Sequence, residues 1–186
     1  FKTPNGGNTH GTSNNTRTEL AQTKKWYPKT ANDKLTATLK VMNVSTSGDA
    51  RVAASYAVVV GQIHSADKHE NEPLKIFYKK FPGHSKGSVF WHYEINTAGD
   101  DNSGRWDFSS AVWGHDFSVV GESENTYPDE PKDGIALGEE FSYEILVKNG
   151  IMTLNFSSKN HQTKTFTKNL IESDYTTKEA IPEQTQ

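Results

Sequence analysis

The residues best suited to chemistry in this sequence are a glutamine and a histidine near the end of a predicted strand. Side chains two positions apart in a strand share a face, which places Gln62 and His64 together. Val58 and Val60 precede them on that predicted face. A strand that turns from apolar to polar suggests that its far end reaches a polar cavity or cleft. The alternative is that both residues lie beside solvent at a strand end, and the residues alone leave this open.

A second pair of polar residues lies in the segment Thr16-Arg17-Thr18-Glu19-Leu20. If this segment is extended, Arg17 and Glu19 project from the same face. The alternative is an exposed ion pair between neighbouring surface side chains, which stabilises a protein little. Taken alone, this pair does not identify a site.

Metal and thiol chemistry find little support in the sequence. The chain has no cysteine, which excludes disulfides, thiolate metal sites and a cysteine nucleophile. His69 is close to Glu70 and Glu72, but the run lacks the spacing of a zinc helix and is interpreted as a solvated loop. Residues 100–104 resemble a calcium loop without its terminal glutamate, and are interpreted as a tight turn. We therefore expect no metal and no cofactor.

The elements that would position these residues are predicted to be strands. Polar and apolar residues alternate with a period of two in residues 35–41, 74–79, 89–95 and 141–148. Asn149-Gly150 has the sequence of a tight hairpin turn. No segment shows convincing helical periodicity, and short strands between turns are typical of a β-sandwich or jelly roll. We therefore predict an all-β fold with a single domain over residues 1–186.

Composition excludes two classes of partner. The net charge of −3 and the isoelectric point near 6.2 are unlike those of a generally basic nucleic-acid binder. Mean hydropathy is −0.76, and no apolar run approaches the roughly 18 residues of a membrane span. We therefore expect neither nucleic acid nor a membrane as a partner.

The order of the two polar motifs points to a known family. Arg17-Thr18-Glu19-Leu20 comes first, and Gln62-Ile63-His64 follows some 40 residues later. Together with residues 73–76 and with 138–143, which read Gly-Glu-Glu-Phe-Ser-Tyr, this set resembles the jelly-roll alginate lyases of polysaccharide lyase family 7 and its relative family 18. One departure is Ala21, where the family commonly has a basic residue.

The resemblance implies a β-sandwich jelly roll with a concave substrate-binding sheet, in a secreted bacterial-type enzyme that cleaves alginate by β-elimination. Removal of the C5 proton of a uronate builds negative charge on its carboxylate, which hydrogen-bond donors must neutralise. The resemblance assigns this catalytic role to Arg17, Gln62 and His64, with Glu19 in substrate binding. His64 is alternatively a base for one of the two uronate epimers, and the scheme requires no metal.

Two lysines in the predicted strand over residues 74–79 could bind the anionic polymer. Lys75 and Lys79 alternate with the apolar Leu74, Ile76 and Tyr78, which are the better candidates for the core. We therefore expect Lys75 and Lys79 to line the substrate cleft. A solvated strand face is the alternative.

A second departure from the family concerns its late strand of the type Tyr-Phe-Lys-x-Gly-x-Tyr-Asn-Gln. Its second tyrosine is the catalytic acid and base that the resemblance implies, and nothing after Tyr143 matches the strand. We therefore expect the domain to be incomplete at its C-terminus, with the strand supplied by further sequence or a second chain.

Two other functions are alternatives to the lyase. They are a non-catalytic carbohydrate-binding module on the same fold and a lectin-like domain for neutral sugars. Binding of alginate, a polyanion, should weaken with salt, whereas binding of a neutral sugar should not.

Overall fold

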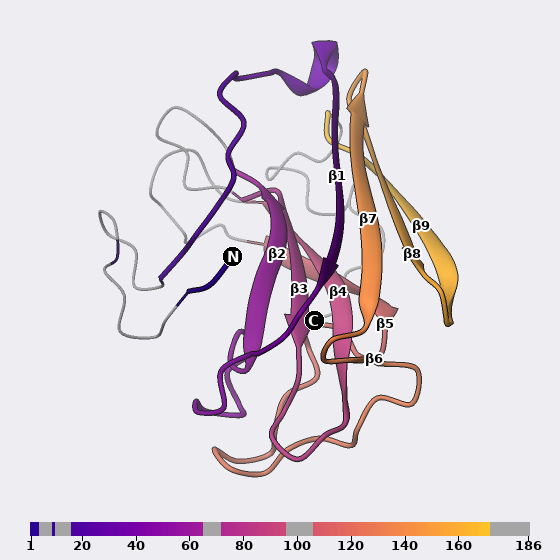
Figure 1. The fold of residues 1–186 in the computed structure, drawn as a ribbon. Coiled ribbons are helices and arrows are strands. Elements are labelled where there is room, and N and C mark those ends of the chain that lie inside the picture. Colours follow the sequence, from indigo (N-terminus) through magenta and orange to yellow (C-terminus); the bar gives the residue numbers. More distant parts are fainter. Residues whose placement is uncertain (4–8, 10–15, 65–71, 96–105, 172–186) are drawn as a thin grey trace.

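The computed structural model describes residues 1–3, 9, 16–64, 72–95 and 106–171, which form two stacked antiparallel sheets (Figure 1). The elements in chain order are η1 (Pro28–Thr30), β1 (Asn32–Lys40), β2 (Ala57–Ile63), β3 (Leu74–Lys79), β4 (Lys86–Ile95), β5 (Trp106–Trp113), β6 (Ile135–Ala136), β7 (Glu140–Lys148), β8 (Ile151–Ser158) and β9 (His161–Asn169). The first sheet has the order β1-β7-β8-β9, and the second has the order β2-β3-β4-β5 with β6 paired to β4. No helix among the described residues is long and apolar enough to span a membrane.

The predicted alternation is confirmed on β3 for the residues that face the core, although both faces of β3 are largely buried and Leu35 of β1 is exposed. Leu74, Ile76 and Tyr78 of β3 have no exposed surface and belong to the hydrophobic core between the sheets. Trp113 of β5 packs against Phe141 of β7 across this core, with ring centroids 6.1 Å apart. The second sheet therefore turns its other face away from the core, and we call this its outer face.

The turn between β7 and β8 also follows the sequence. Asn149 and Gly150 have φ values of 50° and 86°, the left-handed backbone that a type I′ turn demands. Lys148 pairs with Ile151 across the turn. The hairpin predicted from Asn149-Gly150 is thereby confirmed.

A register shift along β2 decides which of its side chains reach the outer face. Before the shift, Val58 lies opposite the core residue Tyr78 of β3. After the shift, Gln62 lies opposite Lys75, which faces outward. The prediction that Val58 and Gln62 share one face is therefore wrong, because an added residue in one strand reverses the alternation.

The shift falls between Val59 and Gly61 and depends on the other sheet. The Tyr143 hydroxyl of β7 donates a hydrogen bond to the Val60 carbonyl at 2.7 Å. A Cβ atom on Gly61 would lie 2.6 Å from that hydroxyl oxygen, so a side chain there has no room. Tyr143 and Gly61 thus fit together across the sheets and fix the bulge.

The Gly61→Ala variant tests this fit. We expect it to lower the free energy of unfolding by about 1–3 kcal/mol, because the added methyl group displaces Tyr143 from the Val60 carbonyl. Urea unfolding measures the loss. In a Tyr143→Leu background the same substitution should be less costly, since the hydroxyl and the ring carbons that the added methyl group would meet are gone. An equal loss in both backgrounds would contradict this account of the bulge.

Candidate active site

Four polar side chains form a row across the outer face of the second sheet. In the register of the strands, Gln62 pairs with Lys75, Lys75 with His92, and His92 with Ser109. Directly opposed residues of antiparallel strands project to the same face. We call these four residues the polar row. The sequence predicts the first two as site residues and does not predict His92 and Ser109.

Glu19 links the N-terminal motif to the polar row. The Gln62 amide Nε2 donates to Glu19 Oε2 at 3.3 Å, and Arg17 Nε lies 3.8 Å from Glu19 Oε1. Arg17 and Glu19 are a little under half exposed, and no described residue of 16–27 belongs to a strand. The structure thus brings Arg17, Glu19 and Gln62 together, as the order of the motifs predicts.

Glu72 connects His64 to the polar row through Lys75. Its Oε1 lies 3.6 Å from His64 Nε2, and its Oε2 is 3.1 Å from the Lys75 ammonium nitrogen. Lys75 is also 3.3 Å from Oε2 of Glu94, which is buried. Glu72 therefore contacts two predicted site residues at once.

The solvated-loop interpretation of residues 69–72 missed this role of Glu72, while His69 and Glu70 lie outside the described residues. The pairing of β2 with β3 would have indicated the contact between Glu72 and His64. Ile63 pairs with Leu74, so His64 and Glu72 leave adjacent ends of β2 and β3 and meet there. The Asp100 turn also lies outside the described residues.

His92 is the buried centre of the polar row. Its Nε2 lies 3.2 Å from Asp107 Oδ1 of β5, and its ring stacks on Phe117 with centroids 4.7 Å apart. Phe117 also lies over Phe77 and Phe90, which stack on each other at 5.1 Å. This aromatic cluster, Phe77, Phe90 and Phe117, covers the outer face beyond the polar row.

Lys79 lies past the aromatic cluster and apart from the polar row. It projects to the same face as Lys75, as predicted, but it is only 4% exposed. Its Nζ donates to the carbonyl oxygen of Ala53 at 2.6 Å. The described contacts therefore place Lys75 within the polar row and Lys79 in a separate, buried setting.

Tyr78 and Tyr143 do not offer an exposed proton acceptor. The hydroxyls of Tyr78 and Tyr143 donate to the carbonyls of Ile135 and Val60, at 2.9 and 2.7 Å. Burial raises the pKa of both Tyr78 and Tyr143, because it disfavours the phenolate. Both stay neutral hydrogen-bond donors within the fold.

The residues that the structure describes contain no candidate metal site. No group of three or more His, Asp or Glu side chains in these parts of the chain is arranged to hold a metal ion. What the polar row and its neighbours offer is a set of N–H donors from arginine, amide, imidazole and ammonium groups. Such a set suits the binding of a carboxylate.

Comparison with known proteins decides the family. A sequence model of the family described as "Alginate lyase" matches residues 1–183. The chain belongs to the alginate lyase family. A curated alginate lyase from Klebsiella pneumoniae is 35% identical over 117 residues, which are 60% of this chain and 33% of the relative. The resemblance seen in the two ordered motifs is thereby confirmed.

Solved structures of the alginate lyase family share the fold. The crystal structure of the exolytic PL7 alginate lyase AlyA5 from Zobellia galactanivorans is 69% identical, with a TM-score of 0.89. The match covers 96% of this chain and 57% of AlyA5. The alginate lyase structure from Klebsiella pneumoniae is 29% identical, with a TM-score of 0.59, over 74% of this chain and 44% of that one. The predicted all-β jelly roll is confirmed, and the chain spans from a third to somewhat over half the length of these relatives.

Proposed function

We propose that this chain forms the substrate-binding and much of the catalytic surface of a lyase that cleaves alginate. The reaction is β-elimination at a 1,4-linked uronate, which gives unsaturated oligosaccharides. The observation that carries the proposal is that Glu19 contacts Arg17 and Gln62, while Glu72 contacts His64 and Lys75, the strand partner of Gln62. Membership of the alginate lyase family supports it.

The chemistry of the reaction explains why these donors are needed. The C5 proton is weakly acidic, and its removal places negative charge on the neighbouring carboxylate. Donors fixed beside that carboxylate stabilise the transition state more than the substrate. Arg17 offers a guanidinium fork, Gln62 an amide N–H, and His64 an imidazole.

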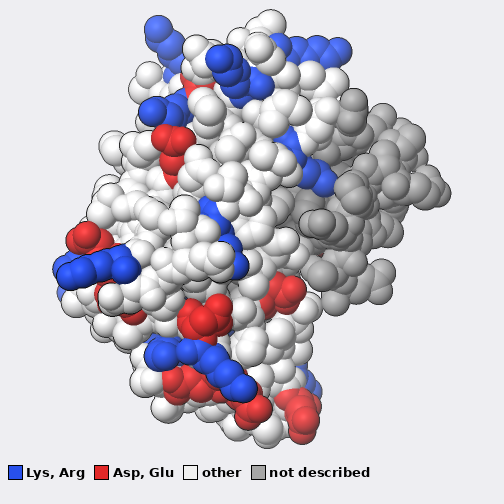
Figure 2. Space-filling view, turned by 90° about the vertical axis from the view of Figure 1, so that its right-hand side faces the viewer, with Lys and Arg blue, Asp and Glu red and all other residues white. Residues whose placement is uncertain are grey.

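On the first sheet, two described lysines are paired with carboxylates. On the side of the molecule that Figure 2 shows, Lys and Arg lie among Asp and Glu, most closely in the lower part of the view. Lys34 lies 3.5 Å from Glu144, and Lys40 lies 3.9 Å from Glu140. These lysines are balanced by carboxylates at the surface, which supports placing the substrate on the outer face of the second sheet.

Two groups are candidates for the proton transfers. His64 lies at the site and can accept a proton as a neutral imidazole. The tyrosine implied by the family motif has no counterpart in the described residues. We therefore propose that a tyrosine on a strand outside these 186 residues, from the same polypeptide or from a second chain, serves as acid and base.

Cleavage from a chain end, the exolytic mode, agrees with the aromatic cluster that covers part of the outer face. AlyA5, the similar lyase from Zobellia galactanivorans, is exolytic. In this chain the aromatic cluster fills the outer face beyond the polar row, with Phe90 fully buried and Phe77 only 6% exposed. A polymer lying along β3 would meet this cluster, so we propose that the enzyme acts from a chain end.

A non-catalytic carbohydrate-binding role is the second candidate. It is favoured by the tyrosine hydroxyls, since those of Tyr78 and Tyr143 are committed to backbone carbonyls. This alternative predicts retention of alginate without product.

We propose a secreted location for either role, because alginate is an extracellular polymer. Activity confined to washed cytosol would contradict this location.

The decisive assay measures unsaturated product by its ultraviolet absorbance when the full-length polypeptide acts on alginate. We expect turnover in the wild-type protein and its loss in His64→Ala. We expect short products from the earliest times, as an exolytic mode requires. Binding without turnover in the full-length wild-type protein would support the binding module and exclude the lyase.

A further inference from the structure

Glu94 of β4 is a buried carboxylate on the outer face of the second sheet. Its side chain is 1% exposed, and its Oε2 accepts a hydrogen bond from the Lys75 ammonium nitrogen at 3.3 Å. A buried carboxylate costs free energy unless a cation and hydrogen bonds compensate it. Lys75 supplies a positive charge to Glu94, and Glu94 in turn limits where the Lys75 ammonium can lie.

The packing of this face does not itself require an ion pair. Two residues along β3 from Lys75, the same face carries Phe77, which stacks on Phe90 of β4 with ring centroids 5.1 Å apart. Replacing a buried ion pair by apolar residues of similar volume is often neutral or stabilising. Apolar side chains would therefore pack here as well, so a function explains the charges of Lys75 and Glu94 better than stability does.

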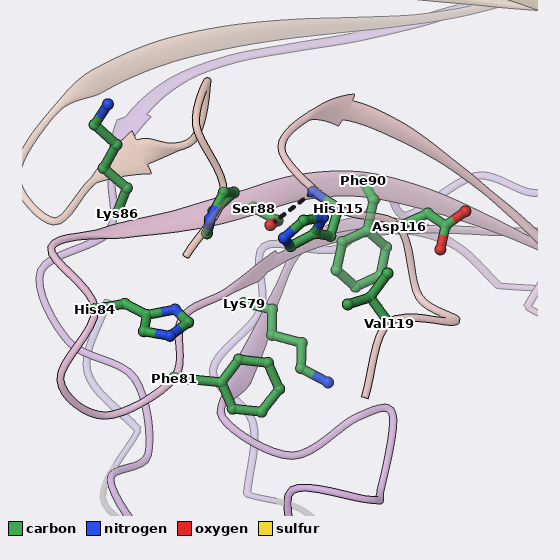
Figure 3. A pocket seen from close by; sticks show the side chains of 10 residues that line it. Lys79, Phe81, His84, Lys86, Ser88, Phe90, His115, Asp116 and Val119 are labelled. Atoms are coloured by element: carbon green, nitrogen blue, oxygen red, sulfur yellow. Dashed lines mark hydrogen bonds between the residues drawn. The ribbon is translucent and has the colours of Figure 1, made fainter. Parts of the chain in front are cut away.

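Lys79, on the same face of β3, is a buried lysine in a different setting. Its Nζ donates to the Ala53 carbonyl at 2.6 Å and lies 4.8 Å from the centre of the Phe81 ring (Figure 3). Among the residues that the structure describes, no carboxylate forms an ion pair with it. Burial lowers the pKa of Lys79 to about 8, because the desolvated ammonium is disfavoured. The two carboxylates at Lys75 are therefore specific to the polar row, and a lysine on this face does not need them in order to fold.

Lys75 joins Glu94 to the residues proposed to act on the substrate. Its Nζ also donates to Glu72 Oε2 at 3.1 Å, and the other oxygen of Glu72 lies 3.6 Å from His64 Nε2. In the strand register Lys75 lies directly opposite Gln62. An ammonium fixed by Glu94 therefore lies one strand away from Gln62 and holds Glu72 beside His64.

We propose that Glu94 is a positioning residue of the lyase, which acts on the reaction through Lys75. The inference rests on the proposed function, since it takes the polar row as the place where the substrate binds. A lysine side chain is long and flexible, and the contacts with Glu72 and Glu94 use two of the three N–H donors of the ammonium. Without the Glu94 contact the ammonium is less fixed, and Glu72 is then less fixed beside His64.

Steady-state kinetics of the full-length protein on alginate tests the role of Glu94. Glu94→Gln keeps the volume and removes the charge, and we expect it to lower kcat about 10- to 100-fold while KM changes less than about threefold. In a Lys75→Met background the same substitution should change kcat less than about twofold, because Glu94 then has no ammonium to hold. This double variant contains neither charge of the pair, so it leaves no ion of the pair buried alone. Glu144→Gln removes a carboxylate beside Lys34 on the first sheet and should leave both constants unchanged.

NMR of the lysine ammonium groups, in protein with isotope-labelled lysine, is a readout that does not need turnover. An ammonium held by two carboxylates exchanges its protons slowly with water, so the wild-type protein should give a Lys75 signal, assigned by its absence in Lys75→Met. Glu94→Gln should lose this signal and Glu144→Gln should keep it. An unchanged signal or an unchanged kcat in Glu94→Gln, or an equal fold loss of kcat with and without Lys75, would overturn the proposal. If the wild-type protein shows no turnover, the proposed function fails, and the ammonium signal alone decides whether Glu94 holds Lys75.

Discussion

The Arg17→Ala variant of the full-length protein is expected to lose about 10²- to 10³-fold in kcat/KM on alginate. One fixed donor to a developing negative charge stabilises a transition state by this order. Arg17 stands beside Glu19, which also receives the Gln62 amide, so its guanidinium lies where a uronate carboxylate would meet both donors. The rate of formation of ultraviolet-absorbing product measures the loss.

Arg51→Ala is the matched control for this variant. Arg51 makes its described contacts with Asp49, at 2.6 Å from Nη2 to Oδ2, in the loop before β2. Its removal deletes the same side chain and charge away from the polar row and should leave kcat/KM unchanged. Arg17→Lys keeps the charge without the planar fork and should be intermediate. Wild-type activity in Arg17→Ala would show that Arg17 does not act on the substrate.

The Glu72→Gln variant is expected to lose about 10- to 100-fold in kcat/KM, mainly through kcat. Glu72 uses one oxygen on His64 and the other on Lys75, and a glutamine offers only one acceptor oxygen. Both His64 and Lys75 would then be less fixed, and small errors in position are costly in an active site. Steady-state kinetics on alginate separates kcat from KM.

The control for Glu72→Gln is Glu139→Gln. Glu139 Oε1 lies 3.0 Å from His161 Nε2, which repeats the carboxylate–histidine contact outside the polar row. This variant removes the same charge and should leave both kinetic constants unchanged. If Glu72→Gln instead lowered KM and spared kcat, Glu72 would act only by repelling the anionic substrate, and its positioning role would be wrong.

Local patterns in the sequence predict the strands well, because burial on one face imposes a period of two. Leu74, Ile76 and Tyr78 reach the core as the alternation predicts, and Asn149-Gly150 makes the predicted turn. The bulge in β2 could not be predicted in this way. It depends on Tyr143, which is more than 80 residues away in sequence and belongs to the other sheet.

The site, too, is predicted where local patterns decide it and not where contacts between distant segments do. The order of the motifs predicts Arg17, Gln62 and His64 as partners, and strand pairing explains why Lys75 lies beside Gln62. The burial of Lys79 could not be read from its own strand. It depends on segments that fold over the outer face, which bring Phe117 onto β3 and the Ala53 carbonyl to the ammonium group.

The central claim is that Arg17, Gln62 and His64 together bind a uronate carboxylate on the outer face of the second sheet. The crystal structure of the full-length protein with a saturated uronate trisaccharide tests it most directly. We expect carboxylate oxygens within about 3.2 Å of donor nitrogens of Arg17, Gln62 and His64. A trisaccharide bound on the first sheet, or one whose carboxylates contact none of these three side chains, would contradict it.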